Sequence, residues 1–404
     1  MISPALVSNI QYPFTDTHCG RKEDTPMKIG IVCQATAGGS GILATELGLA
    51  LAERGNEVHF ISLEAPFRLP TFAQNVYSHY VDVINYPLFK LPPYSLALAS
   101  KISEIAEEFD LGIIHAHYAV PNAVAALLAR DMLPEEKRFC LVTTLHGTDI
   151  TLVGGHPSFY RTTRYAMENS CAVTAVSNWL NEETMREFNL SRPVRTVYNF
   201  LDGDKFLPGA GNRNALARPE EKIIMHISNF RPVKRVTDVV RVFNKVLETL
   251  PAKLVMVGDG PERLAAAGVA KQLGITDRIL YLGNYENIED LLPCADLVMQ
   301  PSEHESFGLV ALEAMACEVP VIVTASGGVK EVVQQGETGY LCEVGDIETM
   351  AAHAVSLLAN PEQAREMGRK GRAHVLQHFQ KNAIVDQYEA LYHEVLEMRQ
   401  KRTR

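Results

Sequence analysis

Short apolar runs alternate with amphipathic stretches along this chain, starting at Met27. Residues 28–33 form an apolar run of strand length, residues 34–41 are rich in glycine, and residues 42–54 have helical periodicity. A second apolar run follows at 57–62. Strand, helix and strand in this order make a βαβ unit, which predicts a parallel sheet.

The same alternation continues, with one interruption, to about residue 347. In the first half, strands are predicted at 111–116, 140–146, 171–175 and 194–198, and helices at 96–109, 121–130, 158–169 and 178–188. Residues 202–221 are rich in Gly, Pro, Asn and charge, which is typical of a linker. In the second half, strands are predicted at 223–228, 254–258, 279–282, 297–300 and 319–324, and helices at 236–249, 262–273, 308–317 and 329–335. The remaining residues have a helical pattern without a strand.

Two α/β runs joined by a linker predict two doubly wound, Rossmann-like domains facing a central cleft. We expect a first domain over 27–200, a second over 201–379, and a C-terminal helix over about 380–404 that packs back on the first. Residues 1–26 lack the apolar and basic segments of a signal peptide, so we expect either a disordered extension or a start codon placed too early. Ligands bind at the carboxyl ends of strands in such folds, so the cleft is the expected site and domain closure is expected.

The bulk composition excludes some classes of function. Of the 404 residues, 47% are hydrophobic and 21% are charged, which is ordinary for a globular protein. The net charge of −10 argues against general binding to nucleic acid or an anionic membrane. No apolar run approaches the ~18 residues of a membrane span. The seven cysteines are scattered without a CxxC pair, so we expect buried thiols in a reducing cytoplasm, with neither disulfides nor zinc.

The segment from Glu305 to Glu313 carries the strongest chemical signal. The residues after Gly308 form a predicted helix that is apolar almost all round, so a carboxylate at Glu313 is costly to bury without a partner. The start of this helix offers free N–H groups and a positive dipole end, which suit a phosphate. Glu305 lies before the predicted helix, Glu313 lies inside it, and the free amides lie between the two. This combination indicates a nucleotide-sugar site. The simpler alternative is an acidic loop followed by a core helix.

Three further loops follow predicted strands. Arg231, Lys234 and Arg235 come after the first strand of the second domain, where they can face a diphosphate, although a solvated basic loop is the alternative. The turn at 258–260 permits close backbone approach, as any glycine turn does. The loop at 38–41 opens a helix but matches neither a G-x-G-x-x-G fingerprint nor a Walker A loop. A dinucleotide-dependent oxidoreductase is the rival interpretation of that loop, and the lack of an acid at the tip of the second strand counts against it.

Polar side chains end two neighbouring strands of the first domain. His115-Ala-His-Tyr118 ends one strand, and the segment from Thr143 to Asp149 ends the next. Because a ligand is expected there, His146 is a candidate for contact with a sugar hydroxyl or an acceptor group. The two histidines of the first segment lack a third ligand at a telling spacing, so we expect no metal. Arg161 and Arg164 follow on a helix and could grip a carboxylate, although surface arginine is an equal alternative.

Together these motifs resemble the retaining family-4 glycosyltransferases with the GT-B fold, over essentially the whole chain from Met27. Ser228-Asn-Phe-Arg231 and segments 39–48, 66–69, 114–118 and 143–151 resemble a narrower group, the glucosaminyl-malate synthases of bacillithiol biosynthesis. That group transfers N-acetylglucosamine from UDP-N-acetylglucosamine to the hydroxyl of L-malate, with retention and without a divalent metal. The broad family has Gly-Arg where this chain has Ser228-Asn229, and the narrower group shares the departure. It leaves open which cation bears on which phosphate.

The resemblance implies a role for each candidate residue. Lys234, assisted by Arg231, would neutralise the diphosphate, Glu305 would contact the donor sugar, and His146 would complete the catalytic set. Glu313 would hold the ribose hydroxyls. The other implied donor-binding residues are Gly39, Ser40, Asn229, Gly258, Asp259, Gly260, Asn284, Ser306, Phe307, Gly308 and Leu309. The implied acceptor-binding residues are Tyr118, Thr143, Thr144, Arg164 and Asn199, with Arg164 on a malate carboxylate. The resemblance implies no cofactor and no metal, and it is compatible with a homodimer.

The expected chemistry is electrostatic and positional, with cations and helix-end amides stabilising the departing UDP. No enzyme base is required, and a front-face path in which the leaving phosphate takes the acceptor proton fits retention. Three alternatives stay open: another acceptor, such as an inositol phosphate, a lipid or a glycan; an epimerase acting on UDP-N-acetylglucosamine; and a nucleotide-sugar-binding regulator without turnover. A glycosidase built on the two glutamates is disfavoured, because they flank a helix start.

Overall fold

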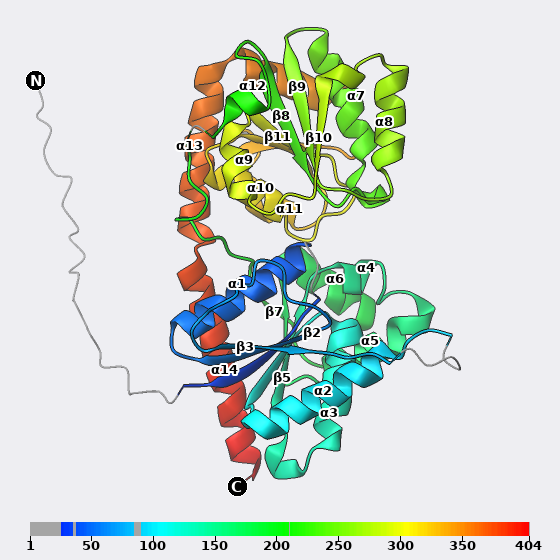
Figure 1. The fold of residues 1–404 in the computed structure, drawn as a ribbon, viewed down its shortest axis with the longest axis vertical. Coiled ribbons are helices and arrows are strands. Elements are labelled where there is room, and N and C mark those ends of the chain that lie inside the picture. Colours follow the sequence, from blue (N-terminus) through cyan, green and yellow to red (C-terminus); the bar gives the residue numbers. More distant parts are fainter. Residues whose placement is uncertain (1–25, 35–37, 85–89, 210, 404) are drawn as a thin grey trace, which may run out of the picture.

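The computed structural model describes residues 26–34, 38–84, 90–209 and 211–403. Two parallel sheets lie one above the other, each flanked by helices (Figure 1). The predicted α/β class with two doubly wound domains is confirmed. The predicted extension at 1–26 lies outside the described residues, apart from its last residue.

The first sheet contains seven parallel strands in the order β3-β2-β1-β4-β5-β6-β7. Its strands are β1 (Lys28–Val32), β2 (Glu57–Ser62), β3 (Val76–Tyr80), β4 (Ile113–His117), β5 (Cys140–Leu145), β6 (Ala172–Ala175) and β7 (Arg195–Thr196). Its helices are α1 (Gly39–Glu53), α2 (Tyr94–Phe109), α3 (Val124–Met132), α4 (Thr148–Thr151), α5 (Pro157–Asn169) and α6 (Asn178–Phe188). The reversal of strand order beside β1 and β4 creates the crevice in which doubly wound folds bind ligands.

The second sheet contains six parallel strands in the order β10-β9-β8-β11-β12-β13. Its strands are β8 (Lys222–Ile227), β9 (Ala252–Val257), β10 (Ile279–Gly283), β11 (Leu297–Gln300), β12 (Val321–Thr324) and β13 (Gly339–Cys342). Its helices are α7 (Val236–Leu247), α8 (Arg263–Gln272), α9 (Ile288–Leu291), α10 (Leu309–Ala316), α11 (Val329–Val332), α12 (Ile347–Ala359) and α13 (Pro361–His378). The last helix, α14 (Lys381–Thr403), leaves this domain.

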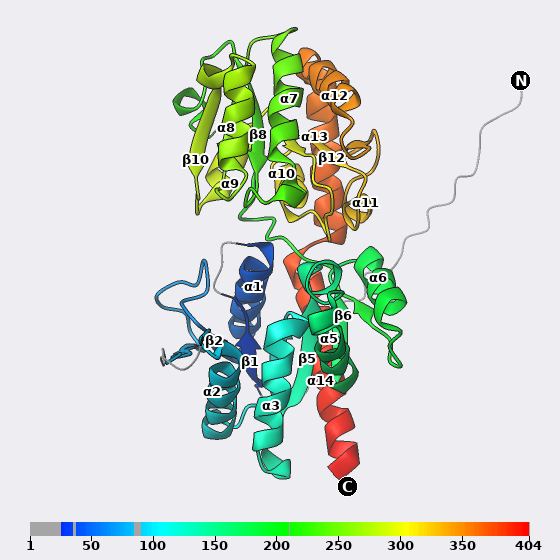
Figure 2. The ribbon, with the colours of Figure 1, turned by 90° about the vertical axis from the view of Figure 1, so that its right-hand side faces the viewer.

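The apolar faces of the helices explain the layers. In the first domain, α1 and α14 share a core cluster with β1 and β2, while α2 and α3 pack against the other face of the sheet. In the second domain, α7 and α12 cover one face, and α10 lies on the other. The cluster around α10 continues into the first domain, because Leu180 and Phe188 of α6 belong to the same cluster as Phe307. The two domains therefore share apolar contacts. Figure 2 shows α6 of the first domain facing α11 of the second.

The sequence prediction missed two edge strands and placed the end of one helix too late. The edge strands β3 and β13 were not predicted. The side chains of β3 are mostly exposed and those of β13 are half-buried in the middle, so neither strand has the continuous apolar run of a central strand. The helix predicted over 329–335 ends early, because Val333 has extended backbone angles and leads into the turn before β13.

Two segments cross between the domains side by side. The linker residue Leu201 forms a parallel bridge with Gln380, and its backbone N–H donates to the carbonyl oxygen of Phe379 over 2.9 Å. Beyond this crossing, α14 packs along the first domain (Figure 1). Arg54 of α1 holds it through Asp386 at 2.6 Å and Glu389 at 2.7 Å. The chain end therefore fastens the second domain to the first.

Within the described residues, no helix combines the length and apolar character that crossing a membrane requires.

The contact between Tyr392 of α14 and His115 of β4 can be tested by mutation. The Tyr392 hydroxyl lies 2.7 Å from Nδ1 of the fully buried His115, whose pKa burial lowers to about 3. Tyr392→Phe leaves a ring nitrogen of His115 unpaired, which costs about 1–3 kcal/mol of unfolding free energy. Urea denaturation followed through the single tryptophan, Trp179, measures the loss. Tyr388→Phe is the matched control, since that hydroxyl is 3.5 Å from its partner Thr144; equal losses in both variants would contradict the prediction.

Candidate functional site

Two loops from opposite domains come into contact across the cleft. Gly147 follows β5 with φ of +108°, and a Cβ built on it would lie 1.7 Å from the hydroxyl of Ser306. Ser306 also contributes its carbonyl oxygen, which accepts a hydrogen bond of 2.7 Å from the Ser177 hydroxyl. Nearby, Gly39 at the start of α1 lies against Leu309, with 3.6 Å from its Cβ position to the leucine side chain. The structure therefore brings the carboxyl-end loops of both sheets together.

The segment 305–309 has the geometry of an anion-binding helix start. Gly308 precedes α10 with φ of +97°, and a Cβ there would lie 2.8 Å from Val329. The first N–H groups of an α-helix have no partner within the helix, so those of α10 face out of its amino end. The Phe307 ring is buried between Tyr198 and Phe379, with centroid distances of 6.2 and 5.6 Å. Phe307 can therefore offer its backbone amide to a ligand, but not its ring.

Lys234 and Glu305 meet at the mouth of this segment. The Lys234 ammonium lies 2.6 Å from the Glu305 carboxylate, and both side chains keep about a quarter of their surface exposed (22% and 24%). Arg231 is exposed beside them, while Arg235 turns back to form an ion pair with Asp238 on α7. Within the described residues, Arg231 thus forms no ion pair, whereas Lys234 is paired with Glu305 and Arg235 with Asp238.

The predicted turn at 258–260 serves the packing of two loops. A Cβ on Gly258 would lie 1.8 Å from the carbonyl oxygen of Ser228, and one on Gly260 would lie 2.2 Å from that of Asn229. These glycines therefore let the two backbones touch, which places Asn229 at the cleft. Asp259 is tied to the Gly260 N–H at 2.8 Å. Asn229, Asp259 and Asn284 are exposed.

Glu313 lies inside α10 as a buried carboxylate. No hydrogen bond joins its side chain to any other residue that the structure describes, and burial raises its pKa to about 8. Arg68 and Lys205 partly offset that rise, whereas Glu289 and Glu46 add to it. Arg68 comes from the first domain and lies 3.6 Å from Glu289, and its buried Nε has no hydrogen-bond partner among the described residues. An unpaired carboxylate and an unpaired guanidinium nitrogen thus occur in one interdomain charge cluster.

The opposite rim is organised by Asp149. Its buried carboxylate accepts hydrogen bonds from the backbone N–H groups of Ala119, His146 and Gly147, at 3.0–3.1 Å. Burial raises the pKa of Asp149 to about 6, and these three donors counteract the rise. One side chain thereby fixes the loops after β4 and β5 relative to each other.

His146 is held in a stack of histidines. Its Nε2 lies 2.9 Å from Nδ1 of His117, and desolvation lowers the pKa of His146 to about 3. The ring is therefore neutral at ordinary pH and a poor proton acceptor. Ser40 donates a 2.8 Å hydrogen bond to the Tyr118 hydroxyl on the same rim, and burial raises the pKa of Tyr118. The rim therefore presents the hydroxyls of Ser40 and Tyr118, and neither His146 nor Tyr118 is a strong base at ordinary pH.

Several predicted acceptor residues lie elsewhere. The Thr143 hydroxyl bonds to Ser170 at 2.8 Å, and that of Thr144 bonds to Thr174 at 2.7 Å beneath the strand ends. Arg164 is exposed and donates to the carbonyl oxygen of Asn189, at the end of α6 that is distant from Ser177. Asn199 is buried beside the linker. The structure does not bring the polar groups of Thr143, Thr144 or Arg164 to the rim that holds Tyr118 and His146.

Sequence reasoning missed two groups that join the domains. Glu331 of α11 accepts hydrogen bonds from the N–H groups of Asn178 and Trp179, at 2.9 and 2.8 Å, and so caps α6 from the other domain. Arg68 was noticed only as part of a resembling segment. A lone charge in the otherwise uncharged stretch at 65–75 was the available signal. Among the described residues, no group of three or more His, Cys, Asp and Glu side chains is arranged to hold a metal ion.

Comparisons with known proteins place the chain in a well-populated group. Residues 37–205 match the family described as Glycosyltransferase Family 4, and residues 211–374 match Glycosyl transferases group 1. The chain is 48% identical over 375 residues to N-acetyl-α-D-glucosaminyl L-malate synthase of Bacillus anthracis, covering 92% of this chain and 97% of the relative. It is 29% identical to D-inositol 3-phosphate glycosyltransferase of Mycobacterium avium, covering 84% and 85%.

Solved structures share the two-domain arrangement. Sucrose-phosphate synthase from Thermosynechococcus elongatus superposes with a TM-score of 0.77 at 23% identity, covering 92% of this chain and all (100%) of that one. Anabaena HepE in complex with UDP and glucose gives 0.76 at 21% identity, covering 90% and 99%. These likenesses support the fold and leave the reaction to other evidence.

The buried carboxylate of Glu313 predicts a pH-dependent stability. Its pKa is about 8 in the folded chain against a usual 4.5, so the folded state holds the proton more tightly. Stability is then lost as pH rises between these two values. Glu313→Gln should therefore raise the free energy of unfolding near pH 8 by about 1–3 kcal/mol, and change it little near pH 5. Urea denaturation at both pH values measures this.

Glu337→Gln serves as the matched control, because Glu337 is exposed in a turn. It should leave both free energies unchanged. A Glu313→Gln variant that is less stable than the parent chain near pH 8 would show that the carboxylate is satisfied in the folded state.

Proposed function

The chain belongs to the family-4 and group 1 glycosyltransferases, and on that premise we propose that it transfers N-acetylglucosamine from UDP-N-acetylglucosamine to the hydroxyl of L-malate, with retention at the anomeric carbon and without a divalent metal. The observation that carries the proposal is the 48% identity to the malate synthase over 97% of its length. The GT-B fold with its cleft between two domains agrees with it.

The donor would bind to the second domain. The N–H groups at the start of α10 and the ammonium of Lys234 would surround the diphosphate, with Arg231 beside them. Glu305 would exchange part of its contact with Lys234 for hydroxyls of the donor sugar. Glu313 would accept hydrogen bonds from the ribose hydroxyls, which would give this buried carboxylate the partners that it lacks.

Arg68 would complete the nucleotide site from the first domain. Its unpaired Nε and the Glu313 carboxylate belong to the same charge cluster, so a ribose bound at Glu313 would lie next to it. Because Arg68 reaches Glu289 only when the domains face each other as they do here, it would couple donor binding to closure.

The reaction would depend on electrostatic stabilisation of the leaving UDP. Negative charge grows on the diphosphate as the glycosidic bond breaks, and Lys234, Arg231 and the α10 amides would stabilise it. The neutral ring of His146 and the raised pKa of Tyr118 leave the rim without a strong base. The acceptor proton would therefore pass to the leaving phosphate on the same face of the sugar. A covalent glycosyl-enzyme trapped during turnover would contradict this path.

The test of function is release of UDP from UDP-N-acetylglucosamine with L-malate, D-malate, an inositol phosphate or no acceptor, in EDTA, with mass spectrometry of the product. We expect release that depends on L-malate and a product with the mass of N-acetylglucosaminyl-malate. Release with another acceptor would keep the glycosyltransferase and overturn the malate assignment. UDP binding without release with any acceptor would indicate a regulator, and release that requires a restored divalent ion would overturn metal independence.

The contact between Gly147 and Ser306 gives a second prediction. Gly147→Ala places a methyl group where the Ser306 hydroxyl lies, at a backbone φ that L-residues avoid, so the loops must separate. Because displacement of about 1 Å at a reacting centre can cost about a hundredfold, we expect kcat/KM to fall by roughly that factor. UDP affinity, measured by calorimetry, should fall less, since most donor contacts lie in the second domain. The matched control is Gly268→Ala on α8, which has open space around it and should keep full activity; comparable losses in both variants would contradict the assignment.

A further inference from the structure

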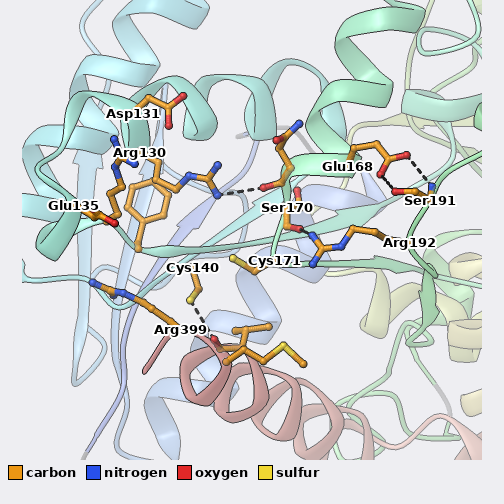
Figure 3. Close-up of a pocket in the computed structure, with 15 residues that line it drawn as sticks. Arg130, Asp131, Glu135, Cys140, Glu168, Ser170, Cys171, Ser191, Arg192 and Arg399 are labelled. Carbon is orange, nitrogen blue, oxygen red and sulfur yellow. Dashed lines mark hydrogen bonds between the residues drawn. The ribbon is translucent and has the colours of Figure 1, made fainter. Parts of the chain in front are cut away.

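A pocket of about 700 Å³ lies in the first domain, at the amino ends of β5 and β6. Figure 3 shows the residues that line it. It is bounded by the ends of α3 and α5, the first residue of β5, the residue before β6, and α14. None of the residues to which we assign a part in glycosyl transfer lines it. Its chemistry therefore requires a separate explanation.

The lining of this pocket contains four arginines and three acidic residues. Arg130, Arg138, Arg192 and Arg399 line it, against the acids Asp131, Glu135 and Glu168. Within the described part of the chain, the first three of these arginines form no ion pair within 4.0 Å. Arg130 and Arg192 donate instead to the carbonyl oxygens of Asn169 and Ser170, at 3.2 and 2.7 Å. Glu168 is bound to the hydroxyl and N–H of Ser191. These three guanidinium groups can therefore still pair with an anion from solution.

Two thiols lie between these arginines. Figure 3 shows the side chains of Cys140 and Cys171 next to each other, with Arg192 beside Cys171. Both pack against the core cluster that α14 completes, Cys140 fully buried and Cys171 partly exposed. The register of β5 and β6 pairs Val142 with Ala172, so Cys140 lies diagonally across from Cys171, one residue out of line with it. One residue along a strand combined with the spacing between strands gives a Cα separation of about 6 Å, which a disulfide can span.

The surroundings of the two thiols shift their pKa values in opposite directions. The neighbouring Cys140 thiol lowers the pKa of Cys171 by hydrogen bonding, burial opposes this, and the Leu141 N–H and the positive potential of Arg130 and Arg192 lower the pKa further. The hydrogen bond to Cys171, followed by burial, raises the pKa of Cys140. The Cys140 thiol can donate its hydrogen bond to Cys171 or to the carbonyl oxygen of Val395, which lies 3.4 Å from the Cys140 sulfur. Burial instead raises the pKa of Cys33, Cys294, Cys317 and Cys342. A partly exposed thiol in positive potential is the reactive kind of cysteine.

We propose that Cys171 is a thiol-modification site that reacts with small anionic disulfides, which the arginine-lined pocket recruits, and that Cys140 resolves the adduct. In the first step the Cys171 thiolate attacks one sulfur of the disulfide, forms a mixed disulfide and expels one thiolate. In the second step Cys140 loses its proton to solvent and attacks the Cys171 sulfur. A Cys140–Cys171 bond forms and the second thiolate leaves. The two cysteines lose two electrons, and the anionic disulfide gains them.

The steering by charge is tested with two disulfides that differ in charge. Dithiobis(nitrobenzoate) is a dianion, and dipyridyl disulfide is neutral; both release an absorbing product. The parent chain carries Cys19→Ser, because Cys19 lies outside the described residues. At about pH 8 we expect the folded chain to react with both, and Cys171→Ser to abolish the fast reaction. Arg130→Gln with Arg192→Gln should slow the dianion roughly tenfold and the neutral reagent less than about threefold.

A matched control replaces two arginines far from the pocket, Arg241→Gln with Arg263→Gln on α7 and α8, and it should leave both rates unchanged. Similar slowing of both reagents in the Arg130/Arg192 variant would overturn recruitment by charge. If the folded parent chain shows no fast reaction with either reagent, the site itself is overturned. Dipyridyl disulfide is neutral, so its rate measures the accessibility of Cys171 without a contribution from charge. No sugar nucleotide takes part, so the outcome is independent of the proposed reaction.

The number of thiolates released tests Cys140. Each parent chain should release two, the second more slowly, and the digest should contain a peptide pair joined through Cys140 and Cys171. Cys140→Ser should release one and retain the mixed disulfide, which adds a defined mass to the intact chain. One thiolate released by the parent chain would overturn the resolving role and keep Cys171 as the modified residue.

Discussion

The approach of Ser306 to Gly147 is the contact on which the arrangement of the cleft depends. Any side chain at position 147 would collide with the serine hydroxyl, so this pair sets how closely the two loops can come together. The hydrogen bond from Ser177 to the Ser306 carbonyl oxygen and the capping of α6 by Glu331 keep the same alignment. Lys234 and Glu305 on one side, and the hydroxyl pair of Ser40 and Tyr118 on the other, consequently face one space.

The interdomain surface contains buried polar groups without partners among the residues that the structure describes. In that part of the chain, Glu313 forms no side-chain hydrogen bond, and the buried Nε of Arg68, which comes from the other domain, has no partner. A buried group of this kind costs stability unless a partner arrives. A nucleotide with ribose hydroxyls and a diphosphate would supply partners for both domains at once. Binding energy would then be used to hold the domains together, and closure would exclude water from the bond being broken.

Much of the fold could be predicted from sequence because central strands carry continuous apolar runs. The edge strands β3 and β13 could not, since the side chains of β3 are mostly exposed and those in the middle of β13 are only half-buried. For the site, the position of a loop after a strand was predictable, and the direction of its side chains was not. Thr144 lies at such a strand end, yet its hydroxyl turns toward Thr174 and the C-terminal helix. Glu331 and Arg68 act across the cleft, and no local pattern contains the placement of one domain against the other.

The C-terminal helix α14 contributes to the arrangement of both domains. It begins where Gln380 pairs with Leu201, at the crossing between the domains, and it ends beside the arginine-lined pocket. Along its length Tyr392 bonds to His115, and His115 bonds to Thr144 at 2.6 Å. These buried bonds run beneath the rim that Asp149 organises. A buried polar network is stable only when its members keep their geometry. The helix that fastens the domains together therefore also holds the strands from which the rim with Tyr118 and His146 projects, and the packing of α14 and the geometry of this rim depend on each other.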